Sequence, residues 1–426
     1  MARITAQNKS EITIEVTIDL NGSIMDMENN IQDASNQIGI LATEKALETF
    51  DTDGSPIQMG SEKWTTKGIY PRKYQTPFGE IIVKRNIYQN SNGGKTYCPL
   101  EFGARIIRKS TPRFSKILSH KYSQSNVVAV CRDLKDNHNR SVSRAYVQKL
   151  VDWVGAIACS KEQQWEYETP TIDEHVASIV VSLDGAHILI REDGWREAMV
   201  GVVSLYNSQG GRLYSIYIGN SPQHGKEKFK QRLEHEVSNI KAKYPNALYV
   251  GIADGAADNW TFLKKHTKLQ LLDYYHVTEY LQKVAMAAYP QRSGKANRQE
   301  WMSNRCSELK HDNGTVESLI IEMEKLANKT SLSKIVKADL LKALTYFKNH
   351  KDMMNYPMHI EQNLPIGSGV TEAACKTLVK QRLCCSGMRW KKHGAHIVLT
   401  LRALVQSGDR WEQFWAKINR YGINLS

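Results

Sequence analysis

The stretch that decides the fold class runs from residue 176 to residue 219 and reads VASIVVSLDGAHILIREDGWREAMVGVVSLYNSQGGRLYSIYIG. Three of its segments, 176–184, 196–207 and 211–219, are apolar and β-branched and have the length of buried strands. Residues 207–211 (NSQGG) have the composition of a hairpin turn between the last two segments. The stretch therefore predicts three consecutive antiparallel strands.

Helical and strand patterns alternate after this stretch. Residues 222–245 carry an amphipathic pattern in which apolar residues recur every three or four positions, as on one face of a helix. A buried strand, a short helix and a further strand follow at 247–254, 259–266 and 269–273. The β-β-β-α-β-α-β order predicts an α/β fold with a mixed sheet, in the order used by ribonuclease H-like domains. Strand order is an analogy of fold and does not by itself establish activity.

The C-terminal part of the sequence is helical in pattern. Between residues 274 and 364 no strand pattern appears, and charged helical segments predict an all-helical insertion. The segment 365–369 (PIGSG) has the glycines and the serine typical of a helix start, so a helix is predicted over 371–383. We expect this helix to return to the core that the strands form.

The N-terminal part combines helical and β patterns. A helical pattern from Ile24 to Phe50 is followed from Lys63 by a period of two, with turn residues at 77–79 and 92–94 that predict a hairpin. The predicted domains are an N-terminal helical region (1–62), a small β-hairpin module (63–109), a helical DNA-binding region with a linker (110–170), the first part of the core (171–273), the helical insertion (274–364) and the last part of the core with basic helices (365–426).

Within the helical DNA-binding region, residues 126–158 read as a helix, a polar turn and a second helix capped by Ser141. The second helix carries Arg144 and Lys149 at polar positions, as a helix that enters a DNA groove does. Short helix pairs with a basic face also occur in ordinary helical domains. Both interpretations, DNA reading and simple packing, remain open at this point.

Charge and cysteine content narrow the class of protein. The 57 Lys and Arg residues exceed the 44 Asp and Glu residues, which gives a net charge of +13 and favours a polyanionic partner, with nucleic acid ahead of a membrane. The seven cysteines form no C-x-x-C pair, so neither a disulfide framework nor a zinc ribbon is predicted. No signal-peptide pattern and no run of 18 apolar residues is present, so we expect a soluble protein of the cytoplasm.

Three carboxylates stand at positions suited to metal chemistry. Asp184 and Asp254 each close a predicted strand and precede a glycine, and Glu372 opens the helix after the insertion. Hard oxygen ligands of this kind suit two Mg²⁺ ions that act on a phosphodiester. Taken singly, an Asp before Gly is usually a turn former, and a Glu in a first helical turn usually complements the helix dipole. Their conjunction with the strand order and with the basic charge favours catalysis.

A basic run follows Glu372. Lys376 and Lys380 lie four and eight positions beyond it, on the same helix face, where they would hold phosphates beside the metals. No acid occurs between Lys376 and Arg402, which weakens the interpretation as a balanced, solvated charge run. The candidate DNA-binding residues of this run are Lys376, Lys380, Arg382, Arg389, Trp390, Lys391 and Lys392. Trp390 suits either base stacking or core packing, and core packing is the more common role of a tryptophan.

Asp273 and His276 lie at the end of the last predicted strand. One Asp and one His do not make a zinc site, so zinc is not predicted. A supporting role that orients the neighbouring active site is expected instead.

Long, co-ordered motifs in this chain resemble bacterial insertion-sequence transposases of the DDE type, in particular the ISKra group, which is distantly similar to Mutator-like transposases. The matching motifs are KWTTKG, YQTPFGEIIVKRNIYQ, GGKTYCPLE, SLDGAHI, WREAMVGVVSLYN, YVGIADGAADNWTFL, LLDYYHVTEYL and PIGSGVTEAACKTLVKQRLCCSGMRWKKHGAHIVLTLRAL. The resemblance covers nearly the whole chain and is far more specific than three scattered acids.

The resemblance implies a ribonuclease H-like core interrupted by the insertion, with Asp184, Asp254 and Glu372 as the catalytic and metal-binding acids. It implies Mg²⁺ or Mn²⁺ as the cofactor and double-stranded DNA as the partner, in the form of terminal inverted repeats and target DNA. It also implies cleavage at the element ends and joining of the 3′-hydroxyls to target DNA. The Asp273-x-x-His276 pair resembles the (Cys/Asp)-x-x-His motif of Mutator-like relatives, beside the catalytic centre. By analogy with paired ends, at least a homodimer is expected, in a bacterial, nucleoid-associated setting.

Two alternatives from other classes remain. A host-adopted DNA-binding protein would use the N-terminal helices and the basic face without catalysis, although its acids would be expected to decay, and here they are intact. A structure-selective DNA nuclease would share the metal chemistry without strand transfer.

Overall fold

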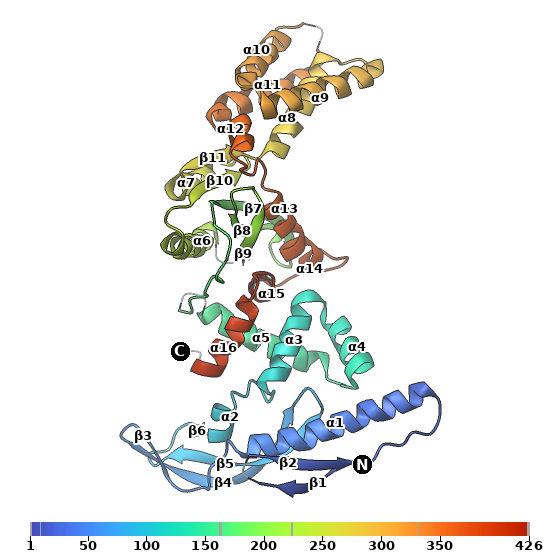
Figure 1. The fold of residues 1–426 in the computed structure, drawn as a ribbon, viewed down its shortest axis with the longest axis vertical. Helices are drawn as coiled ribbons and strands as arrows, with labels where there is room; N and C mark the ends of the chain where they lie inside the picture. Colours follow the sequence, from blue (N-terminus) through green and yellow to red (C-terminus); the bar gives the residue numbers. More distant parts are fainter. Residues whose placement is uncertain (1, 9, 162–163, 223–224, 331, 424–426) are drawn as a thin grey trace. The chain divides into compact units, whose positions relative to one another are not determined.

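The computed structural model describes residues 2–8, 10–161, 164–222, 225–330 and 332–423, and its fold is mixed α/β (Figure 1). The chain divides into two compact units. Unit 1 comprises Met1–Tyr167, Thr400–Val405 and Asp409–Ser426, and unit 2 comprises Glu168–Leu399 and Gln406–Gly408. Among the described residues, no helix is both long enough and apolar enough to cross a membrane.

Unit 2 is built on a five-stranded mixed sheet, and the predicted β-β-β-α-β-α-β order is confirmed. The elements are β7 (Ser178–Ile190), β8 (Gly194–Tyr206), β9 (Arg212–Asn220), α6 (Gly225–Lys243), β10 (Leu248–Ala253), α7 (Ala257–His266) and β11 (Leu269–Leu272). The spatial order is β11-β10-β7-β8-β9. β7, β8 and β9 are antiparallel neighbours, whereas β10 and β11 run parallel to β7.

The prediction that the first strand ends at Asp184 is wrong. β7 continues for six residues to Ile190, and this extension stays paired with β8. Ala186, Ile188 and Ile190 are buried along it. The extension was missed because Gly185 and His187 interrupt the apolar run, although an alternating pattern continues through them. Asp184 therefore lies within a paired strand.

Helices cover both faces of this sheet. On one face, α6 packs against β8, where a Cβ on Gly201 would lie 3.0 Å from the ring of Phe229. On the other face, Thr371 bonds to Ser182 of β7, and Leu399 lies against Gly219 of β9. The helices on this second face are α13 (Gly369–Ala374), a π-helical turn (η4, Cys375–Lys380), α14 (Gln381–Leu383) and α15 (Lys392–Gln406), which contributes residues to both units.

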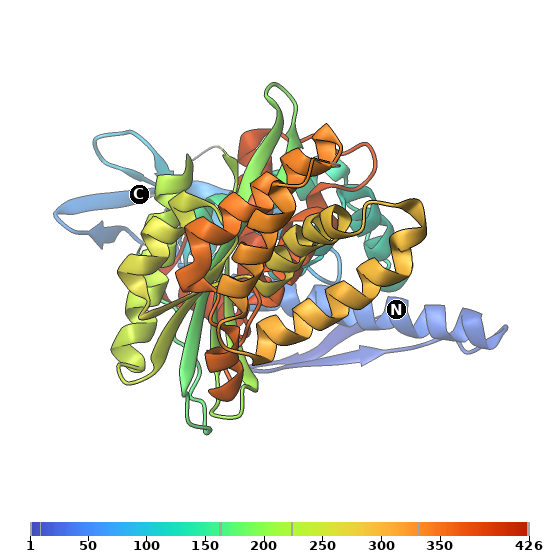
Figure 2. The ribbon, with the colours of Figure 1, turned by 90° about the horizontal axis from the view of Figure 1, so that it is seen from above.

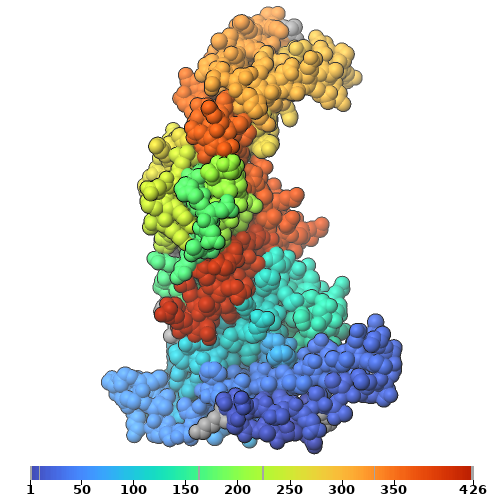
Figure 3. All heavy atoms as spheres, viewed as in Figure 1, coloured from blue at the N-terminus to red at the C-terminus, as the bar shows by residue number. Residues whose placement is uncertain are grey.

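Within the described residues of 274–364 every element is helical, as predicted. The helices are α8 (Tyr274–Ala288), α9 (Lys295–His311), α10 (Thr315–Ala327), α11 (Lys334–His350) and α12 (Tyr356–Glu361), with short 3₁₀ turns at Arg292–Gly294 and Lys351–Met353. α8 packs against α9 and α11 (Figure 2). Figure 3 shows the yellow and orange surface of this segment beyond the sheet of unit 2. Leu319 and Phe347 belong to the same buried apolar cluster as Val180 of β7, so the insertion shares the core of the sheet.

The N-terminal part of unit 1 contains more β structure than expected. Its elements are β1 (Ala2–Gln7), β2 (Ile12–Val16), α1 (Ile24–Glu48), β3 (Ile57–Met59), β4 (Glu62–Gln75), β5 (Glu80–Asn90) and β6 (Thr96–Tyr97). The predicted turns at 77–79 and 92–94 do connect paired strands. The N-terminal region predicted as helical over 1–62 contains the expected helix as α1, and it also contains an antiparallel hairpin of β1 and β2 that was not predicted. Their polar composition concealed the alternation of Ile12, Ile14 and Val16.

Helices make up the rest of unit 1. They are α2 (Pro99–Gly103), α3 (Pro112–Gln124), α4 (Val127–His138), α5 (Arg144–Lys161) and α16 (Arg410–Tyr421). The predicted pair of helices over 126–158 is present as α4 and α5. The cap at Ser141 is wrong, since the hydroxyl of Ser143 accepts the N–H of Tyr146 at 3.2 Å.

Candidate carboxylate site

Three aspartates lie in one row across three parallel strands of unit 2. Ile252 of β10 pairs with Ser182 of β7, so two residues further along the register places Asp254 beside Asp184. On the other side of β10, Ala253 pairs with Leu272, so one residue further along the register places Asp273 beside Asp254. Neighbouring strands are about 4.8 Å apart, and parallel strands end at the same edge of a sheet. The register therefore brings Asp184, Asp254 and Asp273 into one row, which lies at the carboxyl ends of β10 and β11 and within the longer strand β7.

Asp184 is half-buried on β7. Its Oδ1 accepts the N–H of Gly185 at 2.6 Å, and its Oδ2 accepts the thiol of Cys375 at 3.5 Å. Burial raises the pKa of Asp184 above its ordinary value, and the negative charge of Asp254 adds to the rise, against the lowering effect of the Gly185 N–H. The ionised carboxylate is thus under a repulsion that a cation would relieve.

Asp254 is held at the turn between β10 and α7. Its Oδ1 accepts the N–H of Ala256 at 3.2 Å and the side-chain amide of Asn259 at 3.3 Å. Gly255 follows it because a Cβ there would lie 2.5 Å from the ring of Tyr346 on α11. This position therefore requires glycine because an aromatic ring of the insertion lies close to it. The backbone φ of Gly255 is not positive.

Asp273 joins two helices and is fully buried. Its Oδ1 accepts the backbone N–H groups of Tyr275 (2.7 Å) and His276 (3.1 Å) at the start of α8. Its Oδ2 accepts the N–H of Ser368, and also the hydroxyl of Ser368 at 2.5 Å. Ser368 directly precedes α13, so Asp273 fixes the start of the helix that carries Glu372.

Glu372 is exposed in the first turn of α13. Partial burial raises its pKa, the charge of Asp273 raises it further, and His276 opposes the rise. His276 also lowers the pKa of Asp184. Asp273 and His276 therefore lie close enough to Glu372 to affect its pKa, and their supporting role stays a prediction.

The donor chemistry of this neighbourhood fits a divalent cation. Asp184 and Asp254 offer hard carboxylate oxygens side by side, which Mg²⁺ and Mn²⁺ prefer. Among the residues that the structure describes, no three His, Cys, Asp or Glu side chains lie close enough together to hold one ion. The residues able to hold a metal are therefore the pair Asp184 and Asp254, with Glu372 as a nearby third carboxylate.

Cys375 is a site residue that sequence reasoning missed. It is buried in the π-helical turn, three residues after Glu372, and it donates to Asp184. Burial raises the pKa of this thiol well above its ordinary value, and Asp184 adds to the rise, so the group stays protonated as a donor. π-helical turns are frequent at functional sites. Since a lone cysteine on an apolar helix face resembles any core residue, only the tertiary contact reveals it.

The predicted basic residues fall into two groups. Lys376, Lys380, Arg389 and Lys391 are exposed, as is Lys392, which forms an ion pair with Asp193 at 2.6 Å. The prediction that Arg382 binds DNA is wrong for this fold, because the side chain is buried. Its guanidinium lies 5.1 Å from the ring centre of Trp390.

Trp390 is not available for base stacking in this fold. It is half-buried, and its indole N–H donates to the carbonyl of Leu383 at 2.9 Å. Its backbone bonds to Leu189 and Arg191 at the end of β7. The core-packing interpretation of Trp390 therefore fits, and the residue anchors the chain beside the extension of β7. Arg402 is likewise buried, donating to the carbonyl of Ser123 within unit 1.

Arg144 and Lys149 are exposed on α5, in unit 1. The carboxylates and Lys376 belong to unit 2. Each unit therefore carries its own candidate DNA-binding side chains.

Comparison of the chain with family models and with curated proteins finds no match. The mixed α/β fold of unit 2 and the row of aspartates at its sheet edge are thus the basis on which function is argued.

Proposed function

We propose that the protein is a DNA transposase of the DDE type, which binds the terminal inverted repeats of an element, cleaves phosphodiester bonds at its ends and joins the 3′-hydroxyls to target DNA. The observation that carries the proposal is the row of Asp184, Asp254 and Asp273 across three parallel strands, with the helix of Glu372 tied to the last of them. Acids from separate elements at one edge are the arrangement that metal-assisted phosphoryl transfer requires.

The sheet supports the ribonuclease H-like part of the proposal. Three antiparallel strands followed by two that are parallel to the first, in the order β11-β10-β7-β8-β9, match the arrangement of that fold. The helical insertion begins at β11 and ends just before the helix of Glu372. The motif resemblance of the chain to ISKra-group transposases points to the same architecture.

Each residue of the site has a distinct part in the proposed chemistry. Asp184 and Asp254 would hold Mg²⁺ or Mn²⁺, with Glu372 completing the set, and the bound ions would supply activation of the attacking oxygen and charge stabilisation at the leaving oxygen. Cys375 holds the carboxylate of Asp184 in one orientation by donating to it. Asp273 acts as a positioning residue, because its carboxylate accepts hydrogen bonds from the backbone and side chain at two helix starts.

The exposed basic residues that follow Glu372 are proposed to bind DNA phosphates. Lys376 and Lys380 are exposed on the helix that carries this acid, although the π-helical turn between them alters the simple i+4 spacing. Arg389 and Lys391 extend the basic surface. Phosphate contacts of this kind position DNA without reading its sequence.

The test uses single-charge variants of the acids in a cleavage and joining assay. Asp184→Asn, Asp254→Asn and Glu372→Gln should each lower cleavage of terminal-repeat DNA by at least about 10³-fold while DNA binding survives, because each removes an oxygen charge that holds the metals. Glu227→Gln, an exposed acid of α6, is the matched control and should cleave normally. Retained cleavage in any one of the three variants contradicts the assignment of that acid.

A DNA-binding protein without catalysis is the second candidate. The exposed side chains of Lys376, Lys380, Arg389 and Lys391 support it, because a basic surface can bind DNA without any catalysis. DNA binding that is independent of Mg²⁺ and Mn²⁺, with no cleavage by the unaltered chain, would support it. Products with nicks and no joined strands would instead support a structure-selective nuclease.

A further inference from the structure

A basic hollow lies on the β4–β5 sheet of unit 1. Its volume is about 610 Å³, and it draws its lining from both strands, from β6 and from the loop before α3. The lining residues are Lys67, Tyr70, Pro71, Arg72, Lys73, Arg85, Ile87, Thr96 and Lys109. Five of these nine carry a positive charge and none carries a negative one.

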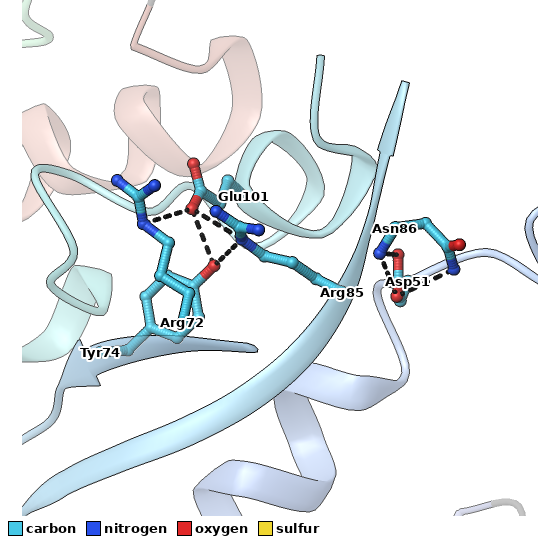
Figure 4. Close-up of polar contacts among 6 residues, drawn as sticks. All are labelled: Asp51, Arg72, Tyr74, Arg85, Asn86 and Glu101. Carbon is cyan, nitrogen blue, oxygen red and sulfur yellow. Dashed lines mark hydrogen bonds and ion pairs between the residues drawn. The ribbon is translucent and has the colours of Figure 1, made fainter. Parts of the chain in front are cut away.

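A single carboxylate orients two of the arginines (Figure 4). The Oε1 of Glu101 lies 3.3 Å from the Nε of Arg72 and 3.2 Å from the Nε of Arg85. The hydroxyl of Tyr74 donates to the same oxygen at 2.8 Å and also accepts the Nε of Arg85 at 2.8 Å. The guanidinium of Arg85 is therefore held by hydrogen bonds from its Nε, whereas Arg72 shares the same carboxylate through an ion pair.

The terminal nitrogens of these two arginines are left unused. In Figure 4 the dashed lines of Arg72 and Arg85 reach only Nε, and within the described residues their Nη atoms make no hydrogen bond. Arg85 is 95 % buried, with a relative exposure of 5 %, yet it lines the hollow. Hydrogen bonds between a guanidinium and an anion are stronger than hydrogen bonds between neutral groups, so these donors favour an anionic partner. Both arginines line the hollow, so a partner bound there can accept from them.

The charge in the hollow is not balanced by the protein. Glu101 serves two arginines, and Glu80 pairs with Lys73 at 2.7 Å. Lys67 and Lys109 are exposed and form no ion pair with any residue of the described chain. Two carboxylates thus face five cations, so the hollow attracts anions.

We propose that the β4–β5 basic hollow binds the phosphodiester backbone of duplex DNA. A planar guanidinium with both Nη atoms free matches two oxygens of one phosphate, and two such groups held side by side suit successive phosphates. The rings of Tyr70 and Pro71 provide apolar contact for the sugar between them. This inference deepens the proposed function, on which it rests, by assigning a sequence-independent DNA contact to the β sheet of unit 1.

The experiment measures binding of the full chain to a fluorescent 30-base-pair duplex of random sequence at several salt concentrations. Lys67→Gln with Lys109→Gln should weaken binding by roughly 10- to 100-fold near 0.1 M salt and lower the salt slope by about 2, one for each lost phosphate contact. Both lysines are exposed, so the fold should survive. The matched control is Lys63→Gln with Lys84→Gln, which removes two exposed lysines of the same strands outside the hollow and should leave the slope nearly unchanged.

A second variant isolates the role of the guanidinium. Arg72→Lys keeps the charge but removes the two-pronged donor, so binding should fall by about 3- to 10-fold with a nearly unchanged salt slope. An unchanged thermal unfolding curve would show that the loss is not a folding defect.

The outcomes separate this inference from the proposed catalysis. Equal slopes for the hollow variant and its control would overturn the inference, even if the chain cleaves DNA. Competition by polyglutamate as effective, charge for charge, as competition by duplex DNA would also overturn it, because the hollow would then be a general carboxylate site suited to an acidic protein. Binding that depends on the hollow in a chain that never cleaves DNA would support the inference and contradict the proposed transposase activity.

Discussion

The aspartate row of unit 2 and the basic hollow of unit 1 each bring like charges together, but only the hollow places a counterion of the protein between them. At the sheet edge, Asp184 and Asp254 lie side by side, and burial and repulsion raise the pKa of Asp184. In the hollow, Arg72 and Arg85 share Glu101, which separates and orients the two cations. The difference teaches that the two aspartates, which have no counterion in the protein, favour binding of an external cation. The two arginines already have a counterion, and their remaining donors are free to bind an anion.

The largest effect on stability is expected where a buried charge is fully satisfied. Asp273→Asn keeps the shape of the side chain but presents an amide to the N–H and hydroxyl of Ser368, or to the two N–H groups of α8. The free energy of unfolding of unit 2 should fall by about 2–4 kcal/mol, because a buried donor then faces donors. Urea unfolding followed by tryptophan fluorescence measures this change.

Asp258→Asn is the control for this prediction. Asp258 is an exposed acid of α7 whose ion pair with Lys230 is 2.7 Å long. Its substitution should change the free energy of unfolding by less than about 1 kcal/mol, as for most surface ion pairs. Equal effects of the two variants would show that Asp273 is not the connection between α8 and α13 described above.

An intermediate effect is expected from removal of the internal counterion in the hollow. Glu101→Gln leaves the guanidinium groups of Arg72 and Arg85 without their shared charge, so the free energy of unfolding of unit 1 should fall by about 1–3 kcal/mol. Added sulfate or phosphate should restore part of the loss, since an anion can take the place of the carboxylate. Thermal unfolding with and without the anion tests this, and a variant as stable as the unaltered chain without anions would break the comparison.

The smallest effect is expected from neutralising one member of the unrelieved pair. A raised pKa in the folded state means that Asp184 binds its proton more readily there than in the unfolded chain, so its contribution to stability is fully present at low pH and lost as the pH rises through the folded value. Asp184→Asn should therefore raise the unfolding temperature by about 2–4 °C at pH 7 in EDTA, the effect of ~1 kcal/mol in a domain of this size.

Two measurements sharpen this last prediction. The gain from Asp184→Asn should shrink as the pH falls and disappear at about pH 2, well below the ordinary aspartate pKa, where the carboxyl is protonated in both states. Stabilisation by Mn²⁺ should be present in the unaltered chain and absent in the variant. A variant that is less stable than the unaltered chain at pH 7 in EDTA would contradict the assignment of repulsion at the sheet edge.

Much of the core follows from local patterns. The apolar runs of residues 176–219 suffice to predict three antiparallel strands, and the lack of β patterns over 274–364 suffices to predict helices. Asp184 and Asp254 are readable as partners because each stands at the carboxyl side of a buried run, and parallel pairing brings such positions to one edge. These predictions succeed because side-chain periodicity reports directly on burial.

Other features depend on contacts between residues far apart in the chain. Asp273 meets Ser368 across 95 residues, and Cys375 meets Asp184 across 191 residues. The burial of Arg382 and the packing of Trp390 depend on how the segment after α14 returns to β7. The hollow needs the register of β4 with β5 and the placement of Glu101 beside both strands.

The sequence by itself determined the mixed α/β class and the helical character of residues 274–364, because both follow from the local spacing of apolar and polar residues. Only the tertiary structure decided which charges are satisfied and which are left facing open space. Strand register and helix packing set those pairings, and neither has a signature within a short window of sequence.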